Sequence, residues 1–311
     1  MGALGLNAVL ADDGRRINAA AAGSHFGGTA KRVIHFFCNG GPSHVDTFDH
    51  KPALAKYAGQ RLGETLTTER KTGAAFPSPF KFRPYGESGI EVSDLFSRTA
   101  QHIDDIAVIR SMYAQVPNHE PSLMLMNCGD SVQARPSAGA WVLYGLGAEN
   151  QNLPGFIAMW PGGLPIKDSE NWQAGFLPGA YQGTHIDTQH TQLSRLIENI
   201  EHPQISTPDQ KRQLELLAKW NRQHQSGRLD RRLESRIQSY ELAFRMQDKM
   251  PELMDLSKET AETQAMYGIG EDATDTFAKQ CLMARRFVES GVRFVEISHS
   301  NWDHHTNLKA E

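Results

Sequence analysis

The sequence predicts an α/β fold built on a mostly parallel sheet. Short apolar runs at residues 33–38, 106–109, 156–159 and 292–297 have the length and composition of strands that are buried on both faces. Segments with helical spacing separate these runs, and the order strand, helix, strand is typical of a βαβ unit. Polar side chains directly follow the first and the last run, and open α/β sheets bind ligands at the carboxyl ends of their strands.

The helices and loops are expected from local patterns. Pro52 suits the first turn of a short helix, and Ser93 can cap the segment that follows it. Leu229, Leu233 and Ile237 recur at helical spacing and form one apolar face. The expected helices cover residues 52–57, 92–99, 121–128, 137–146, 208–250 and 277–288, and the long loops cover 60–90 and 160–190.

Composition limits the class of protein. The chain has 311 residues, of which 39% are hydrophobic and 22% charged, as in a soluble globular protein. A net charge of −4 argues against a protein that binds nucleic acid through its charge. No apolar run is long enough to span a membrane. Cys38, Cys128 and Cys281 lack the spacing of a zinc site or a disulfide framework, and we interpret them as core residues.

The first residues indicate export. Residues 1–10 are apolar and rich in small side chains, like the end of a secretory signal whose basic front is missing. Residues 14–30 are rich in Ala and Gly and have the composition of a linker. We therefore expect residues 1–30 to be the remnant of an export signal and a linker, and the protein to be periplasmic or secreted. The alternative is an ordinary frayed N-terminus.

A polar cluster follows the first predicted strand. After the sharp turn Asn39-Gly40-Gly41-Pro42 come Ser43, His44, Asp46 and Asp49. These side chains have the composition of one wall of an active site. The alternative is an ordinary turn in which Asp46 or Asp49 caps the next helix.

A second polar cluster follows the last predicted strand. It contains His299, Asp303, His304 and His305, and carboxylate together with imidazole suits zinc, manganese or iron. A solvated surface loop is the alternative. If the sheet is parallel, both clusters lie at one edge, so we expect His44 and Asp46 to face Asp303 and His305 across a metal site.

The chain also resembles a known family. The blocks VIHFFCNGGPSHVDTFDHKPAL, NHEPSLMLMNCGD, RPSAGAWVLYGLG and GVRFVEISHSNWDHH are similar to the bacterial domain-of-unknown-function 1501 family, from about Lys31 to the last residue. That family is placed in the alkaline-phosphatase and sulfatase superfamily and usually carries a twin-arginine export signal. The resemblance implies an alkaline-phosphatase-like three-layer sandwich over residues 31–311, with a helical insertion at 208–250, and metal-assisted ester hydrolysis.

The resemblance also implies two candidates for the reacting residue. His119-Glu120-Pro121-Ser122 has the spacing of the sulfatase nucleophile motif, which places His119 at the nucleophile's position. Ser137 begins a segment similar to the helix start that carries the phosphatase nucleophile, although it can equally be an N-cap. Arg110 or Arg135 can hold the anionic oxygens of the ester.

The chain departs from the superfamily at three points. The Cys and the Arg of the sulfatase motif are absent, and Asn39 stands where phosphatases have an Asp after the first strand. Family members also continue beyond the Trp-Asp-x-His block with further Asp and His residues. We therefore expect this chain to be a fragment at both ends, with a fold that is incomplete at its C-terminus.

The sequence thus predicts an exported, metal-dependent hydrolase-like protein that uses zinc, manganese or calcium. Its expected substrate is a small-molecule or polysaccharide ester of phosphate or sulfate. The alternative is an inactive binding or scaffolding protein of the cell envelope with the same fold. A metal-dependent mutase or a phosphonate-cleaving enzyme of the same superfamily is a third possibility.

Overall fold

The computed structural model describes residues 28–63, 73–190, 193–197, 200, 204–225, 231–300 and 302–308. The chain divides into two compact units. The first unit comprises Met1–Phe37 and Leu123–His299, and the second comprises Cys38–Ser122 and Ser300–Glu311. The predicted remnant of an export signal, residues 1–30, lies almost entirely outside the described residues.

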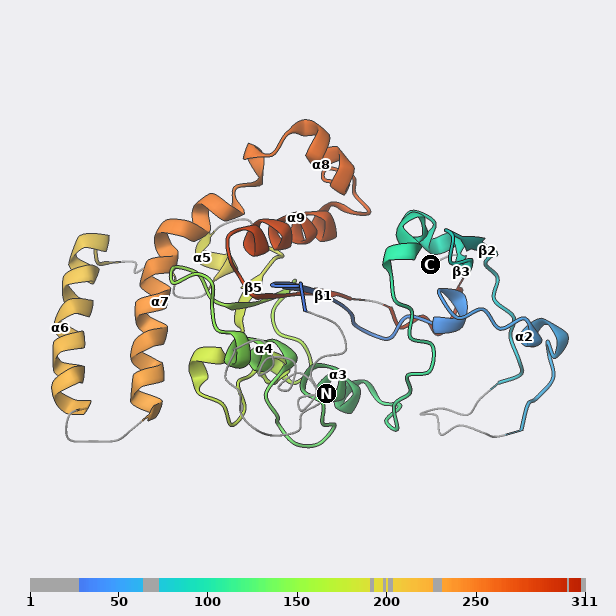
Figure 1. Cartoon of the computed structure of the whole chain (residues 1–311), viewed down its shortest axis with the longest axis horizontal. Coiled ribbons are helices and arrows are strands. Elements are labelled where there is room, and N and C mark those ends of the chain that lie inside the picture. The colour runs from blue at the N-terminus through green and yellow to red at the C-terminus, as the bar shows by residue number, and fades with distance from the viewer. Residues whose placement is uncertain are drawn as a thin grey trace. The chain divides into compact units, whose positions relative to one another are not determined.

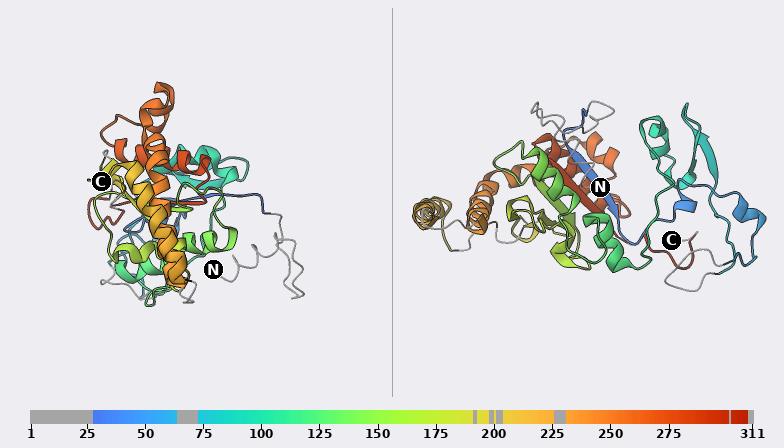
Figure 2. Two further views of the ribbon diagram at one scale, coloured as in Figure 1. Left: turned by 90° about the vertical axis from the view of Figure 1, so that its left-hand side faces the viewer. Right: turned by 60° about the horizontal axis from the view of Figure 1, so that its bottom comes forward.

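The first unit is built on a four-stranded sheet. Its strands are β1 (Val33–Cys38), β6 (Phe294–His299), β4 (Phe156–Trp160) and β5 (Thr184–Asp187), in that spatial order. The central strand β4 runs parallel to both β5 and β6. Figure 2 shows β1, in blue, beside β6, in red. The predicted α/β class with a mostly parallel sheet is confirmed.

Strand β4 is central because every one of its residues is apolar and buried. Ile157 and Met159 face one side of the sheet, where they pack with residues of β6 and of the helices that cover that face. Phe156 and Ala158 face the other side and pack with Phe294 of β6. A strand that buries both faces needs this continuous apolar sequence, because successive side chains point to opposite sides.

Helices cover both faces of this sheet. Helix α9 lies over one face and α4 over the other (Figure 1). The α-helices that belong wholly or mostly to the first unit are α3 (His119–Cys128), α4 (Ala138–Leu146), α5 (Leu193–Leu196), α6 (Thr207–Gln225), α7 (Arg231–Met254), α8 (Ala261–Tyr267) and α9 (Asp275–Glu289). Its 3-10 helices are Asp168–Trp172, Gly179–Tyr181 and Leu256–Lys258. Among the described residues, no helix combines the length and the apolar character needed to cross a membrane.

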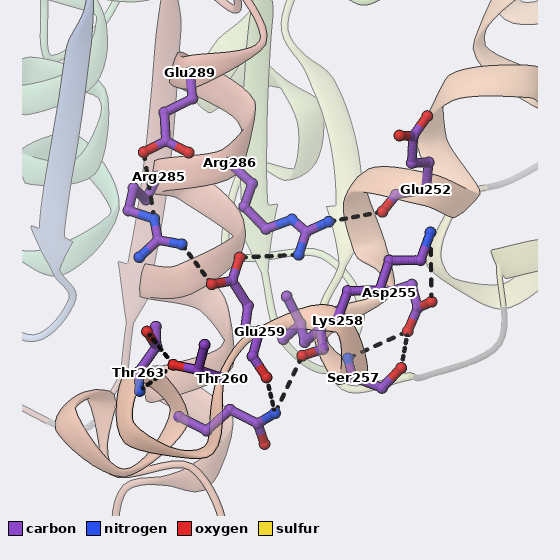
Figure 3. Close-up of polar contacts among 12 residues, drawn as sticks. Glu252, Asp255, Ser257, Lys258, Glu259, Thr260, Thr263, Arg285, Arg286 and Glu289 are labelled. Carbon is purple, nitrogen blue, oxygen red and sulfur yellow. Dashed lines mark hydrogen bonds and ion pairs between the residues drawn. The ribbon is translucent and has the colours of Figure 1, made fainter.

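An ionic cluster joins α9 to the segment before α8 (Figure 3). The carboxylate of Glu259 lies 2.8 Å from Nη2 of Arg285 and 3.0 Å from Nη1 of Arg286. Arg286 also donates a hydrogen bond to the backbone carbonyl of Glu252 at the end of α7. Three helical segments are therefore tied together through two guanidinium groups.

A buried carboxylate inside the sheet lies beside a histidine. Glu296 of β6 is 4% exposed, and its Oε2 lies 3.5 Å from Nδ1 of His35 on the neighbouring strand β1. The hydroxyl of Ser298, two residues along the same face of β6, is buried without a hydrogen-bond partner among the described residues. A buried carboxylate is costly without a partner, so the contact with His35 constrains how β1 docks on β6.

The second unit is small and rich in loops. Its regular elements are α2 (Ala53–Lys56), β2 (Phe82–Tyr85), β3 (Ile90–Ser93) and the 3-10 helices His44–Asp46, Asp94–Phe96 and Thr99–Asp105. Strands β2 and β3 form an antiparallel hairpin. The core of this unit is Val92, Ala100 and Ile103, against which Phe48 and Phe96 pack.

The structure confirms the expected strands at residues 33–38, 156–159 and 292–297 and the expected helices at 52–57, 121–128, 137–146 and 277–288, to within a few residues at their ends. The helical stretch expected at 208–250 is two helices, α6 and α7, and residues 226–230 between them lie outside the described residues. Two expected loops are partly wrong. The described part of residues 60–90 contains β2 and the start of β3, and residues 160–190 contain β5. Both regions have strands that are short, partly exposed and polar, so they lack the apolar pattern of a buried strand.

Two further expectations are wrong. Residues 106–109 form no strand. Ile106 and Val108 pack on the core of the second unit, whereas Ile109 is 65% exposed, so the segment alternates like a strand without a pairing partner. Residues 92–99 form the end of β3, the 3-10 turn Asp94–Phe96 and the first residue of the 3-10 helix Thr99–Asp105, and not the expected helix. Ser93 nevertheless caps that turn, because its hydroxyl accepts the N–H of Leu95.

Candidate functional site

Asp303 is the centre of the candidate site, which lies in the second unit. One oxygen of its carboxylate, Oδ2, lies 3.0 Å from Nε2 of His119 and 2.9 Å from Nε2 of His305. The contact from His119 is a hydrogen bond, in which the ionised carboxylate accepts and the ring nitrogen donates, whereas the contact from His305 is an ion pair in which the ring is charged only when it is protonated. A single acidic group therefore holds two imidazole rings.

The backbone at Asp303 is held by the turn that follows β1. The N–H of Trp302 donates a 3.0 Å hydrogen bond to the carbonyl group of Asn39. The next residue, Gly40, has φ +106°, and a Cβ placed there would lie 2.7 Å from the backbone nitrogen of Asp303. Only glycine permits both this backbone angle and this close approach.

His119 is the first residue of α3. The start of this helix is fixed by Ser122, whose backbone N–H donates to the carbonyl of Asn118 and whose hydroxyl donates to the carbonyl of Val116. The side chains of His119, Asp303 and His305 are 42%, 35% and 51% exposed. A soluble ligand can therefore reach both rings.

His44 and Asp46 lie in the second unit as well, but they are not joined to Asp303. Asp46 is buried, its Oδ2 accepts the hydroxyl hydrogen of Ser43, and its Oδ1 has no hydrogen-bond partner among the described residues. The ring of His44 is exposed. No hydrogen bond or ion pair in the described part of the chain connects either residue to Asp303 or His305.

Arg110 is bound close to Asp49. Its Nε donates a 2.9 Å hydrogen bond to the carbonyl of Phe48. The Lys51 ammonium, which bonds the Asp49 carboxylate, is the main cause that holds the pKa of Asp49 below its usual range, and the charges of His44 and Arg110 add to it. This region therefore gathers cations around one buried carboxylate.

Ser137 belongs to the first unit. It is 1% exposed and occupies the N-cap position of α4, but its side chain does not cap the helix. Its hydroxyl and its backbone N–H both donate to the carbonyl of Gln173, at 3.1 and 3.0 Å. The hydroxyl is thus committed to a structural contact, and a catalytic role for Ser137 stays a prediction.

A metal site is not preformed in the described residues. No group of three or more His, Cys, Asp and Glu side chains among them has an arrangement that could hold a metal ion. Of the four ligands expected from the sequence, the structure brings Asp303 and His305 together, while no hydrogen bond or ion pair among the described residues joins His44 or Asp46 to them. It adds His119, which the sequence suggested as a reacting residue.

Sequence reasoning missed the support behind these side chains. It gave no role to Trp302, and it treated Gly40 only as part of a turn. It also missed the buried pair His35–Glu296, although a charged residue within each apolar strand is a visible signal of such a pair. The hydrogen bond between His119 and Asp303 has no local signal, because the two residues are far apart in the sequence.

Fold and site together define an α/β protein with an exposed imidazole–carboxylate–imidazole cluster. A family model described as "Protein of unknown function (DUF1501)" matches residues 30–311, which is most of the chain. The protein therefore belongs to this family. Neither the comparison with curated proteins nor the comparison with solved structures gave a match.

Proposed function

We propose that this protein is an exported hydrolase-like protein that acts on phosphate or sulfate esters at the cluster of His119, Asp303 and His305. The observation that supports it most is the contact of two histidine rings with Asp303 Oδ2, a hydrogen bond from His119 and an ion pair with His305. Carboxylate-oriented imidazoles are a recurring device of hydrolases, because the carboxylate fixes the tautomer and orientation of the ring.

The tautomer defines what His119 can do. If Nε2 carries the proton that is donated to Asp303, then Nδ1 of the neutral ring has a free lone pair. That nitrogen can take a proton from water as a general base or attack the ester as a nucleophile. Asp303 stabilises the positive charge that the ring acquires in either role.

The donor set also fits a divalent metal of the borderline class. Two imidazoles and one carboxylate suit zinc or manganese, whereas calcium prefers oxygen ligands, so calcium fits less well. His119, Asp303 and His305 would hold the ion only after a rearrangement, because they form no metal-binding group as they lie, and each ring would bind through a nitrogen that carries no proton. When bound, the metal would polarise the ester oxygen.

The architecture is compatible with the superfamily implied by the sequence. An alkaline-phosphatase-like sandwich has helices on both sides of a mostly parallel sheet, and the first unit has this layering. We propose this ancestry, and with it a small-molecule or polysaccharide ester as the substrate. The apolar residues 1–10 support the proposal of export.

Hydrolysis of 4-nitrophenyl phosphate and 4-nitrophenyl sulfate, with zinc or manganese added, tests the proposal. We expect turnover that falls by about 10²-fold or more in His119→Ala, which removes the reacting imidazole. His304→Ala is the matched control, because His304 is an exposed histidine of the same loop whose ring makes no hydrogen bond or ion pair with Asp303 among the described contacts. Absence of turnover across both esters, or equal activity of His119→Ala and the wild type, contradicts the proposal.

A binding protein without catalysis is the second candidate. The observation that favours it is the commitment of Ser137, whose hydroxyl is buried against the carbonyl of Gln173. Elemental analysis separates the two candidates: purified protein that retains neither zinc nor manganese and hydrolyses neither ester supports a binding or scaffolding role.

A further inference from the structure

The candidate site is connected to the core of the second unit by aromatic rings. The indole of Trp302 stacks on the ring of Phe96, with centroids 6.2 Å apart and planes at 21°. Phe96 in turn contacts Phe48, with centroids 5.1 Å apart. Both phenylalanines pack against Val92, Ala100 and Ile103, which form the core of this unit. The three aromatic residues form a ladder that leads from the core to the residue next to Asp303.

The inner end of this ladder is rigidly placed. Phe96 lies in the 3-10 turn Asp94–Phe96, which Ser93 caps through the N–H of Leu95. Ser93 is fully buried, and its own N–H donates to the carbonyl of Thr47, the residue before Phe48. Phe48 and Phe96 are therefore held together by this backbone hydrogen bond between their neighbouring residues as well as by the contact of their rings.

The outer end of the ladder meets the turn after β1. The N–H of Trp302 is hydrogen-bonded to Asn39, and Gly40 leaves room for the backbone of Asp303. The peptide that carries Asp303 is thus fixed at its backbone by the turn and at the neighbouring side chain by Phe96. Offset stacking of this kind is directional, because the edge and face of a ring carry opposite partial charges.

We propose that Trp302 is the positioning residue of the candidate site. Its stacking on Phe96 sets the place of the Asp303 carboxylate so that one oxygen meets both His119 and His305. This role rests on the site put forward under the proposed function, but it concerns the geometry of the rings and not turnover. It predicts that the two histidines lose their fixed tautomer when the indole is removed.

The ¹⁵N chemical shifts of the histidine rings test this role. In neutral imidazole the separation between the Nδ1 and Nε2 shifts is largest when one nitrogen holds the proton all the time, and it shrinks when the two tautomers exchange. The protein is labelled with ¹⁵N-histidine and measured at about pH 8, where an ordinary histidine is neutral. His119→Ala and His305→Ala assign the two sets of signals by their loss.

Four variants are compared with the wild type. Trp302→Ala removes the indole, Trp302→Phe keeps an aromatic face, and Asp303→Asn removes the acceptor charge. Trp220→Ala is the matched control, because Trp220 is 60% exposed on α6 in the first unit. We expect locked Nε2–H tautomers in the wild type, Trp302→Phe and Trp220→Ala, and exchanging tautomers in Trp302→Ala and Asp303→Asn. Ester turnover, where present, should fall about tenfold or more in Trp302→Ala and remain within about threefold in Trp302→Phe.

The inference is overturned if the histidines of Trp302→Ala keep a single tautomer. It is also overturned if the histidines of the wild type already exchange between the two tautomers. Circular dichroism shows whether Trp302→Ala folds. If it does not, Phe96→Leu decides, because it keeps an apolar side chain and removes the stacking face. Locked rings in that variant also overturn the inference. If the histidines of the wild type keep a single tautomer but the protein hydrolyses no ester, the hydrolase proposal fails and the positioning role of Trp302 stands.

Discussion

A Cβ atom built on Gly40 lies 2.7 Å from the backbone nitrogen of Asp303, well inside the distance that real side chains keep. The turn after the first strand and the loop after the last strand therefore touch without a side chain between them. Asp303 owes its position to this close approach, to the hydrogen bond between Trp302 and Asn39 and to the stacking of Trp302 on Phe96.

The first prediction concerns this contact. Gly40→Ala should displace Asp303, so that His119 and His305 no longer keep a single tautomer. Backbone strain alone should lower the free energy of unfolding by about 1–3 kcal/mol. Gly41→Ala is the matched control, because Gly41 also has a positive φ, +91°, but a Cβ there meets nothing within 4 Å. Urea unfolding measures the strain that both variants share. Histidine ¹⁵N shifts that change equally in both variants, or in neither, contradict the prediction.

The second prediction concerns the ionic cluster of Figure 3. The hydrogen bond from Arg285 is the main cause that lowers the pKa of Glu259, and the charges of Arg285 and Arg286 add to it. A lowered folded-state pKa means stability that is present above the unfolded pKa, about 4.3 for Glu, and is lost as the pH falls through the lower folded value. Glu259→Gln should lower the Tm at neutral pH and reduce the acid sensitivity of the Tm.

Glu252→Gln is the control for that experiment. Arg286 bonds the backbone carbonyl of Glu252, which the substitution leaves in place. The Tm of Glu252→Gln should stay close to that of the wild type at neutral pH and at each acidic pH. A Glu259→Gln protein with the pH profile of the wild type is the result that counts against a role for this carboxylate in stability.

The third prediction concerns the cysteines. Burial, with smaller contributions from the negative charges of Glu296 and Glu170, raises the pKa of Cys128 to about 12, and burial raises that of Cys281 to about 11. Because the thiolate is the reactive form, both should resist iodoacetamide at about pH 8 in the native protein and react once it is denatured. Mass spectrometry of the alkylated peptides measures this, and rapid native labelling of Cys128 would be inconsistent with its burial.

The fourth prediction separates the two candidate reacting residues. Ser137→Ala should lose about 1 kcal/mol of folding free energy, because it removes the hydrogen bond from the hydroxyl to Gln173. Any ester turnover should remain within about threefold of the wild type, since the hydroxyl is committed to that contact. Ser131→Ala is a control in a neighbouring loop. A loss of turnover in Ser137→Ala as large as in His119→Ala would instead assign the nucleophile to Ser137.

The strands that sequence reasoning found are those with apolar sequences. Of these, β4 and β6 are buried on both faces as expected, whereas β1 lies at the edge of the sheet and has one buried residue, Phe37. β1, β4 and β6 read as apolar runs, and β4 is buried at every position. β5 was missed because Thr184–Asp187 is a polar edge strand with one buried residue, Ile186. The hairpin of β2 and β3 was missed because Pro84 and charged residues interrupt its pattern. A partner strand, which the local sequence does not encode, makes these segments into strands.

The same limit applies to the candidate site. The ligand-type residues His119, Asp303 and His305 were identified from their chemistry and their place after strands and before a helix. Which of them would meet was not predictable from spacing, and His44 and Asp46 were expected nearer to them than the described contacts support. Nothing local marks Trp302 as their support, because stacking on Phe96 depends on tertiary structure.

The hydrogen bond between Asn39 and Trp302 has a consequence for biosynthesis. It joins a residue made early on the ribosome to one made close to the end of this chain, and Leu123–His299 of the first unit is translated between them. Closing so long a segment costs entropy that only a folded intervening region offsets. The sheet of the first unit can therefore assemble before Asp303 reaches its two histidines, and formation of the cluster then depends on a folded first unit.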